Sequence, residues 1–257
     1  MSRTVVDAAD LERRVKDMYT QVALEPHARY HFEMGRAMAS RLGYTDEQLD
    51  AAPPASIESF AGVGYYFGLA NLRPGERVVD LGSGSGMDSF IAAHKVGANG
   101  QVTGIDMTDA QLEKAERLGK EHGFTSVQFR RAFIDETGLS DGCCDVVISN
   151  GVINLSPDKA AVFREAARLL GPGGRLALAD IVTGVPLPET VSCDATLWAA
   201  CIGGAMQRDA YVEAIEDVGF TVTAMKSNDE YRFLSRSAQN ATRDYGVQSV
   251  SLLAIRN

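Results

Sequence analysis

Between residues 76 and 182 the sequence alternates short apolar runs with amphipathic segments, and this alternation limits the folds that the chain can adopt. Helical patterns at 89–97, 108–123 and 157–170 separate the apolar runs, whose lengths are typical of buried strands. Strands that alternate with helices favour a parallel, doubly wound sheet with right-handed crossovers. The apolar runs are ERVVDLG, GQVTGIDM, VQFRRA, DVVISN and GRLALADIV, with two later strands near 220–225 and 249–256. The pattern therefore predicts a Rossmann-like α/β sheet of seven strands.

Capping residues predict where several helices begin. Thr45 and Gln48 form a capping-box pattern, and Thr108 with Gln111 repeats it at the start of 108–123. Ser156 followed by Pro157 is typical of an N-cap and a first helical residue. We also expect a helix near 208–218.

The first seventy residues have a helical pattern without strands. Two helices are predicted within 8–42, one before and one after Pro26. The sequence thus predicts a helical N-terminal lid or substrate segment at 1–70 and a Rossmann-like domain at 71–257. Within that domain, 183–210 is expected to be an inserted segment on the substrate side.

Charge and hydropathy exclude several classes of partner. The chain has 257 residues and a formal net charge of −9, without the clustered Lys and Arg that contacts to nucleic-acid phosphates need. No run of about 18 apolar residues predicts a membrane span, and the N-terminus lacks the apolar centre of a signal peptide. The four cysteines form no CxxC pair. We therefore expect a cytoplasmic protein with a small-molecule ligand.

A glycine-rich loop follows the first strand and indicates the ligand class. Asp80 ends that strand, three alternate glycines follow at 82, 84 and 86, and Asp106 closes the next strand. A dinucleotide loop needs a further glycine at Met87 or Ser89, and Asp80 with Asp88 would repel a diphosphate. S-adenosylmethionine has no phosphate and carries a sulfonium, an ammonium and a ribose diol. The loop therefore favours S-adenosylmethionine over a dinucleotide.

Each part of this cofactor has a predicted contact. Asp106 is expected to accept hydrogen bonds from the ribose hydroxyls, and Gly82 and Gly84 to let the backbone approach the methionyl part. Phe133 and Ile134 are predicted walls for adenine, with Asp135 as an acceptor for its amino group. Asn150, at the end of the fourth strand, is predicted to face the methionyl end, unless it is a strand-end cap.

Four stretches resemble the class I S-adenosylmethionine-dependent methyltransferases and, more narrowly, the arsenite methyltransferases. They are VVDLGSGSGMDSFIAAHKVGANGQVTGIDMT, DVVISNGVINLSPDKAAVFREAARLLGPGGRLALADIV, PLPE and LWAACIGGA. They lie within about residues 62–206. The resemblance implies a methyltransferase sheet, S-adenosylmethionine as the cofactor and a small-molecule methyl acceptor.

The resemblance also implies where trivalent arsenic would bind, and there the sequence departs from it. The family holds arsenic with cysteine thiolates at three positions, which read Gly151, Val63 and Cys201 here. A thiophilic metalloid needs two or three converging thiolates. Cys143 and Cys144 precede the fourth strand, about 15 Å from its far end at about 3.3 Å per residue. Cys193 lies eight residues before Cys201 and stays an open candidate.

Candidate acceptor-side residues come from the lead-in. His27 and His31, spaced by four on a predicted helix, would provide a general base or bind a metal, although we prefer to interpret them as partly exposed surface residues. Cys201 is a remaining ligand or a small buried residue. Tyr65 and Tyr66 line a pocket or pack on the first strand, and Trp198 is core or pocket wall. The candidate cofactor-binding residues are Tyr19, Asp80, Gly82, Ser83, Gly84, Asp106, Met107, Phe133, Ile134 and Asn150. Tyr19 is alternatively a core aromatic.

The sequence leaves four hypotheses. The leading one is methyl transfer from S-adenosylmethionine to a small molecule through a changed acceptor site. The second is arsenite methylation by Cys201, with Cys193 or an external thiol. The third is a protein that binds the cofactor without transferring its methyl group, and the fourth, an NAD-dependent dehydrogenase, is disfavoured by the glycine spacing.

Overall fold

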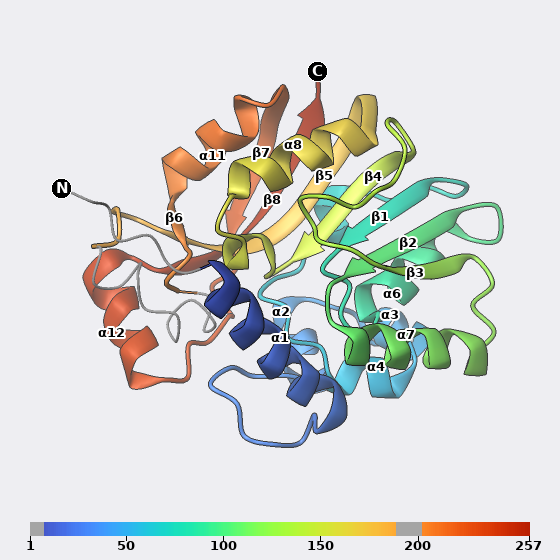
Figure 1. The fold of residues 1–257 in the computed structure, drawn as a ribbon, viewed down its shortest axis with the longest axis horizontal. Coiled ribbons are helices and arrows are strands. Elements are labelled where there is room, and N and C mark those ends of the chain that lie inside the picture. The colour runs from blue at the N-terminus through green and yellow to red at the C-terminus, as the bar shows by residue number, and fades with distance from the viewer. Residues whose placement is uncertain (1–7, 189–201) are drawn as a thin grey trace.

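A computed structural model describes residues 8–188 and 202–257. Its strands form one sheet in the order β3-β2-β1-β4-β5-β8-β7, with the two-residue β6 paired to β5 (Figure 1). The five neighbouring strands β3, β2, β1, β4 and β5 run parallel to one another, and β8 is antiparallel to both β5 and β7. The predicted α/β sheet is confirmed, with seven long strands and the short β6.

The strands lie close to the predicted apolar runs, except that β5 begins at Leu170, before the predicted run GRLALADIV and within the helix predicted at 157–170. Their bounds are β1 Arg77–Leu81, β2 Gln101–Asp106, β3 Val127–Arg131, β4 Cys144–Asn150, β5 Leu170–Thr183, β6 Met206–Gln207, β7 Phe220–Ser227 and β8 Gln248–Arg256. Each central strand is apolar on both faces because helices cover both sides of the sheet. Val78, Val146 and Ile148 face one hydrophobic cluster, whereas Val79 and Val147 face the other. This alternation with a period of two divides the core into two layers.

Helices cover the two faces of the sheet in two groups. The described helices are α1 Ala8–Leu24, α2 Arg36–Leu42, α3 Asp46–Ala51, α4 Pro54–Glu58, α5 Phe67–Ala70, α6 Met87–Val96, α7 Asp109–Glu121, the 3₁₀ turn η1 Ile153–Leu155, α8 Lys159–Leu169, α11 Arg208–Glu216 and α12 Arg236–Tyr245. In Figure 1, α8 and α11 cover one face, while α6 and α3 lie on the other. Helix α1 crosses in front of the carboxyl ends of the central strands. The sequence had not predicted α12.

Two of the three predicted caps differ from the structure. Thr45 and Gln48 form the expected capping box. Thr108 is the N-cap residue of α7, as predicted, but its side chain makes no cap hydrogen bond, and the Gln111 side chain bonds Ser85 and the carbonyl of Tyr19 instead of closing a capping box. The prediction for Ser156 was wrong: α8 begins after Asp158, whose carboxylate accepts the amide of Ala161.

The second lead-in helix is shorter than predicted, and the shared helix face of His27 and His31 was wrong. Residues 25–35 form turns and irregular backbone, and α2 begins only after Gly35, whose φ is +86°. Stacked rings hold this segment, with the Tyr30 and Phe32 centroids 5.6 Å apart. A glycine with positive φ interrupts the helical pattern that spacing alone had suggested. Within the described part of the chain, no helix is long and apolar enough to cross a membrane.

Candidate functional site

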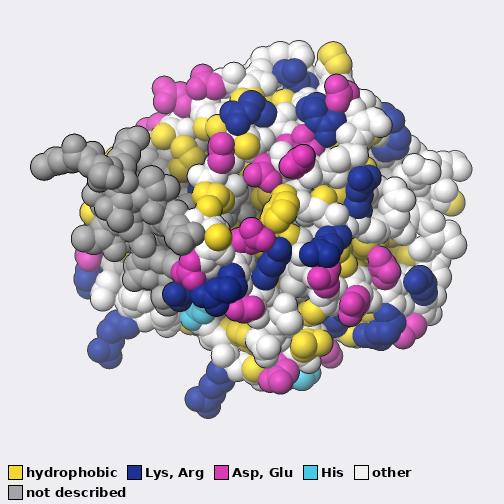
Figure 2. All heavy atoms as spheres, viewed as in Figure 1, with side chains coloured by type: hydrophobic (Ala, Val, Ile, Leu, Met, Phe, Trp, Pro, Cys, Tyr) yellow, Lys and Arg dark blue, Asp and Glu magenta, His cyan; other side chains and the backbone are white. Residues whose placement is uncertain are grey.

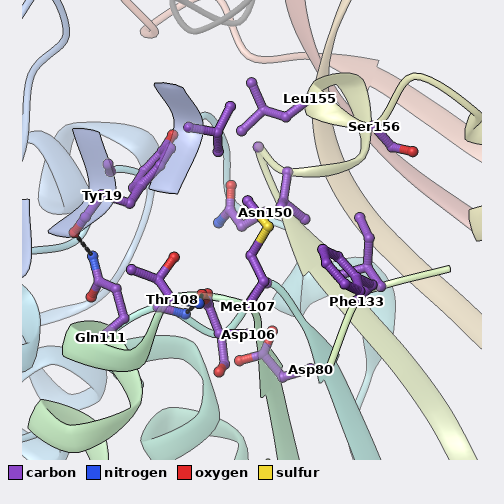
Figure 3. A pocket seen from close by; sticks show the side chains of 18 of the residues that line it. Tyr19, Asp80, Asp106, Met107, Thr108, Gln111, Phe133, Asn150, Leu155 and Ser156 are labelled. Carbon is purple, nitrogen blue, oxygen red and sulfur yellow. Dashed lines mark hydrogen bonds between the residues drawn. The ribbon is translucent and has the colours of Figure 1, made fainter. Parts of the chain in front are cut away.

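A cavity of about 410 Å³ opens at the carboxyl ends of the parallel strands, beneath α1. In open α/β sheets, ligands bind at this end of the strands. The ten residues that the sequence predicted for the cofactor all line it. In Figure 3, Asp80 and Asp106 lie at one side of the cavity, and Leu155 and Ser156 at the other. We call the part around Asp80, Asp88 and Asp106 the acidic end, and the part around Leu11, Val15 and Leu155 the apolar end.

Asp106 is fixed at the end of β2 by the backbone of its own loops. Its carboxylate accepts the amide of Gly84 at 2.9 Å and the amide of Thr108 at 2.8 Å. Burial raises the pKa of Asp106, and these amide bonds oppose the rise. The carboxylate lines the cavity with an orientation set by the backbone, as an acceptor for a ribose diol requires.

Asp80 is the most perturbed carboxyl group of the acidic end. It is buried at the end of β1, where the Ser89 hydroxyl donates to it at 2.6 Å. Burial, reinforced by the nearby charge of Asp88, raises the pKa of Asp80 to about 8. At neutral pH such a pKa favours the protonated form, and a cationic ligand beside Asp80 would favour its ionised form.

Asp88 is the centre of a buried network that the sequence had not predicted. The hydroxyls of Tyr44 and Tyr66 donate to its carboxylate at 2.7 and 2.8 Å, and the Asn150 amide donates at 3.0 Å. Burial raises the pKa of Asp88, whereas these three donors lower it. Buried charges persist where they are well hydrogen-bonded. No short motif could have revealed this site, since Tyr44 lies 44 residues away from Asp88.

Asn150 joins that network to residues 62–64. Its side-chain oxygen accepts the amide of Val63 at 2.8 Å, and its nitrogen donates to the carbonyl of Gly64 at 3.1 Å and to Asp88. Asn150 also lines the cavity. The amide thus fixes the segment before β1 against the end of β4, in addition to any contact with a ligand.

The glycine loop provides space and polar atoms for a cofactor. Gly84 has φ +53°, and a Cβ there would meet nothing closer than 3.7 Å. The Ser83 hydroxyl is buried at the cavity wall without a hydrogen-bond partner among the described residues. At Gly82, a Cβ would come within 2.6 Å of the Val152 side chain, so protein packing explains this glycine. The loop fits a ligand that offers polar atoms to Ser83 and approaches the backbone at Gly84.

The loop after β3 supplies an aromatic wall. Phe133 lines the cavity beside Ile134 and Asp135, yet 43% of its surface is exposed. The ammonium of Lys16 on α1 lies 5.2 Å from the centre of the Phe133 ring. An exposed ring at a cavity wall is suited to stacking against a flat, apolar group such as adenine.

Gln111 connects the glycine loop to the helix above it. Its side-chain oxygen accepts the Ser85 hydroxyl at 2.5 Å, and its nitrogen donates to the carbonyl of Tyr19 at 2.9 Å. The Tyr19 ring stacks on Phe32 with centroids 6.3 Å apart. Tyr19 therefore lines the cavity from a helix that is anchored to α7.

Gly151 and Val63, two positions for which the resemblance implies arsenic ligands, lie side by side. A Cβ on Gly151, whose φ is +73°, would stand 3.1 Å from a methyl group of Val63. Val63 is buried, and Gly151 lines the cavity. Cys201, the third such position, lies outside the described residues, as do Cys193 and Trp198.

The remaining candidates lie away from the cavity. His27 is exposed, with its Nε2 3.9 Å from Glu58, and neither His27 nor His31 lines the cavity. His31 packs edge-on against Phe32. Tyr65 accepts a hydrogen bond from Gln48 instead of lining the cavity. Cys143 and Cys144 lie at the start of β4, at the opposite end of the strand from Asn150.

A second buried cluster shapes the turn at the apolar end. Asp180, at the end of β5, accepts the amide of Asn154 at 3.0 Å and the Tyr211 hydroxyl at 2.9 Å. Lys159 donates to the carbonyl of Ser156 at 3.0 Å. Burial raises the pKa of Asp180 and lowers the pKa of Lys159. The turn carrying Leu155 is thus held from below by side chains that no sequence signal identified.

Comparisons with known proteins match this architecture. A family profile described as "Methyltransferase domain" matches residues 72–235. A second, for protein-L-isoaspartate (D-aspartate) O-methyltransferase, matches residues 4–137. The two profiles share residues 72–137, which include β1, the glycine loop and β2. The overlap therefore covers the acidic end.

Individual relatives agree with the narrower resemblance. The chain is 38% identical to an arsenite methyltransferase of Halobacterium salinarum over 83% of this chain and 54% of that protein. It is 42% identical to one of Aquipseudomonas alcaligenes over 61% of this chain and 48% of that protein. The chain thus spans about half the length of the curated relatives that it matches.

A solved structure gives the same fold. An arsenic (III) S-adenosylmethionine methyltransferase from Chlamydomonas reinhardtii superposes with a TM-score of 0.64 at 29% identity, covering 87% of this chain and 74% of that chain. Its match, the two profiles and the glycine loop between Asp80 and Asp106 agree with one another. The chain belongs to the methyltransferase domain family, the S-adenosylmethionine-dependent methyltransferases.

Proposed function

We propose that the chain binds S-adenosylmethionine at the acidic end and transfers its methyl group to a small molecule at the apolar end, in the cytoplasm. The cofactor would supply a methyl group that its sulfonium already activates, so the protein has mainly to orient the acceptor and exclude water. Asp106 would hold the ribose, Phe133 and Ile134 the adenine, and Asp80 with Ser83 the methionyl part. Residues 1–70 would form the lid.

The observation that supports a changed acceptor is the contact between Gly151 and Val63. If both positions carried cysteine, as the resemblance implies for the family, two thiols would meet beside the cavity. Here a hydrogen atom and an isopropyl group occupy them. A soft metalloid would find neither thiolate, so the proposal assigns this site to an organic acceptor.

The test is a screen for labelled methyl transfer together with calorimetry of S-adenosylhomocysteine. We expect the product analogue to bind, and label to pass from S-adenosylmethionine to at least one organic nucleophile. Absence of binding would refute the cofactor assignment. Binding without transfer to any acceptor would instead support a non-methylating role.

Arsenite methylation is the second candidate, because the curated relatives at 38–42% identity are arsenite methyltransferases. It would rely on Cys201, with Cys193 or an external thiol. This candidate predicts arsenite-dependent release of S-adenosylhomocysteine that Cys201→Ser abolishes and Cys143→Ser does not. Undiminished arsenite turnover in Cys201→Ser would eliminate the role of Cys201, and no arsenite turnover by the parent chain would eliminate arsenite methylation.

A further inference from the structure

The charges around the cavity are all of one sign. Its described lining includes six acidic side chains but no Lys, Arg or His. The acidic residues are Glu12, Asp80, Asp88, Asp106, Asp135 and Glu136. An anionic group that entered this cavity would meet carboxylates and no cationic side chain of the described wall.

The nearest cation on the covering helix is already engaged. Lys16 pairs with Glu12 at 2.6 Å, and its ammonium lies over the Phe133 ring. Figure 2 shows Lys and Arg side chains spread over the face instead of gathered in one patch. Lys16 is therefore poorly placed to neutralise a ligand inside the cavity.

A metal ion would be the other way to hold an anion. Phosphate groups in particular bind through divalent cations, which need several oxygen ligands from the protein. Among residues 8–188 and 202–257, no group of three or more His, Cys, Asp or Glu side chains is arranged to hold a metal ion. At the acidic end, Asp88 already accepts three hydrogen bonds from side chains and Asp106 two from backbone amides.

The apolar end offers mainly hydrocarbon to a ligand. Leu11 and Val15 of α1 and Leu155 of the turn after β4 are buried, belong to one hydrophobic cluster and line the cavity. Phe60 joins them. The nearby hydroxyls are already bonded: Ser56 donates to the carbonyl of Pro53, and Ser59 donates to the carbonyl of Val22 and accepts from Lys114. Transfer of an unpaired charge into such surroundings is costly, whereas an apolar surface gains from burial.

We propose that the methyl acceptor is an uncharged, largely apolar molecule and that the site rejects carboxylate and phosphate acceptors. This proposal rests on the proposed function. In the transfer, the nucleophilic atom forms a bond to the methyl carbon, and the S–CH₃ bond breaks with its electron pair left on sulfur. The proton of the neutral nucleophile passes to water, so a neutral acceptor and a cationic cofactor give two neutral products and a proton.

Matched pairs of acceptors test the charge preference directly. Benzyl thiol, phenol and aniline would each be compared with the para-carboxylated analogue, using methyl-labelled S-adenosylmethionine and the full chain. We expect at least one neutral member to be methylated, with kcat/KM at least about tenfold above that of its carboxylated analogue, because a buried unpaired carboxylate costs more than 1.4 kcal/mol. Equal or faster transfer to the carboxylated members, or transfer to no neutral member while S-adenosylhomocysteine still binds, would overturn the proposal.

A positive charge placed at the apolar end should reduce the preference for neutral over carboxylated acceptors. Val15→Lys adds a cation to the wall, and Val15→Met adds similar length without charge. We expect Val15→Lys, but not Val15→Met, to reduce the ratio between the neutral and carboxylated members at least about threefold. An unchanged ratio in a folded Val15→Lys chain that still binds S-adenosylhomocysteine would contradict the proposal. If the parent chain does not bind S-adenosylhomocysteine, the proposed function itself is refuted.

Discussion

The acidic end of the cavity is built from consecutive strand–loop units, whereas the apolar end combines segments that are distant in the sequence. Asp80, the glycine loop and Asp106 fall within 27 residues of chain and depend on local backbone geometry. The apolar end brings together α1, residues 60–62 and the turn at 151–157. Side chains such as Asn150 and Asp180 hold these pieces in place. A local signal can thus specify the cofactor side, while the acceptor side depends on long-range contacts.

The largest expected effect is at the acidic end. Asp106→Ala removes the carboxylate that the ribose diol would bind and the acceptor of the Gly84 and Thr108 amides. Two lost charge-assisted hydrogen bonds correspond to about 3 kcal/mol, so calorimetry should show S-adenosylhomocysteine binding weakened at least about 100-fold. Asp109→Ala, an exposed acid in an ion pair with Arg131, is the control and should bind normally. Unchanged affinity in Asp106→Ala would remove the basis of the cofactor assignment.

The hydrogen bonds of Asn150, which connect the two ends of the cavity, should contribute to the stability of the fold. Asn150→Ala leaves the amide of Val63 and the carbonyl of Gly64 without their partner and removes one donor from Asp88. We expect the free energy of unfolding to fall by about 2–3 kcal/mol in urea denaturation. The exposed Asn240→Ala should change it by less than about 0.5 kcal/mol. Equal effects of the two substitutions would show that the network contributes little.

The raised pKa of Asp80 predicts a pH-dependent affinity. Below its pKa of about 8 the Asp80 carboxyl group is mainly protonated, and a cationic cofactor favours the ionised form. The affinity for S-adenosylmethionine should rise as pH increases, by up to about tenfold per pH unit below that pKa, with proton release on binding. Calorimetry in buffers of different ionisation enthalpy would measure the release, and Asp80→Asn should flatten the profile.

The carboxyl group of Asp80 should also make the stability of the fold depend on pH, and stability should fall as pH rises whereas cofactor affinity increases. The pKa of Asp80 is about 8 in the folded chain, against the ordinary value of 3.8. Between these values the folded state binds more protons than the unfolded state, so its contribution to stability is lost as pH rises through the window. Asp80→Asn should therefore be more stable than the parent near pH 8 while binding the cofactor less well. A parent that gains stability over this window relative to Asp80→Asn would contradict the assignment.

The smallest expected effect is at the apolar end. Gly151→Ala places a Cβ at positive φ, 3.1 Å from Val63, which should cost about 1–2 kcal/mol of stability. Affinity for S-adenosylhomocysteine should change less than about threefold, because the altered wall lies away from Asp106. Thermal denaturation and calorimetry would separate the two quantities. Val63→Ala is the matched control, since it removes methyl groups from the same contact without backbone strain.

Much of the fold was predictable because its signals are local. The strand lengths, the helix α7 and the capping box at Thr45 depend on short-range hydrophobic periodicity and hydrogen bonds. The predictions that were wrong involve competition from distant partners. The Gln111 side chain bonds Ser85 and Tyr19 instead of closing a capping box, and Phe32, next to His31, stacks on Tyr19 of α1 instead of continuing a helix.

The sequence by itself determined the α/β sheet and a loop suited to S-adenosylmethionine, because a strand, three alternate glycines and two carboxylates are specified within one short stretch. Only the tertiary structure decided that Asp88 is the centre of a buried network, that Val63 meets Gly151, and that the described cavity wall carries carboxylates without cations. These features join residues from separate elements. Their positions follow from how helices and strands pack, which no local pattern encodes.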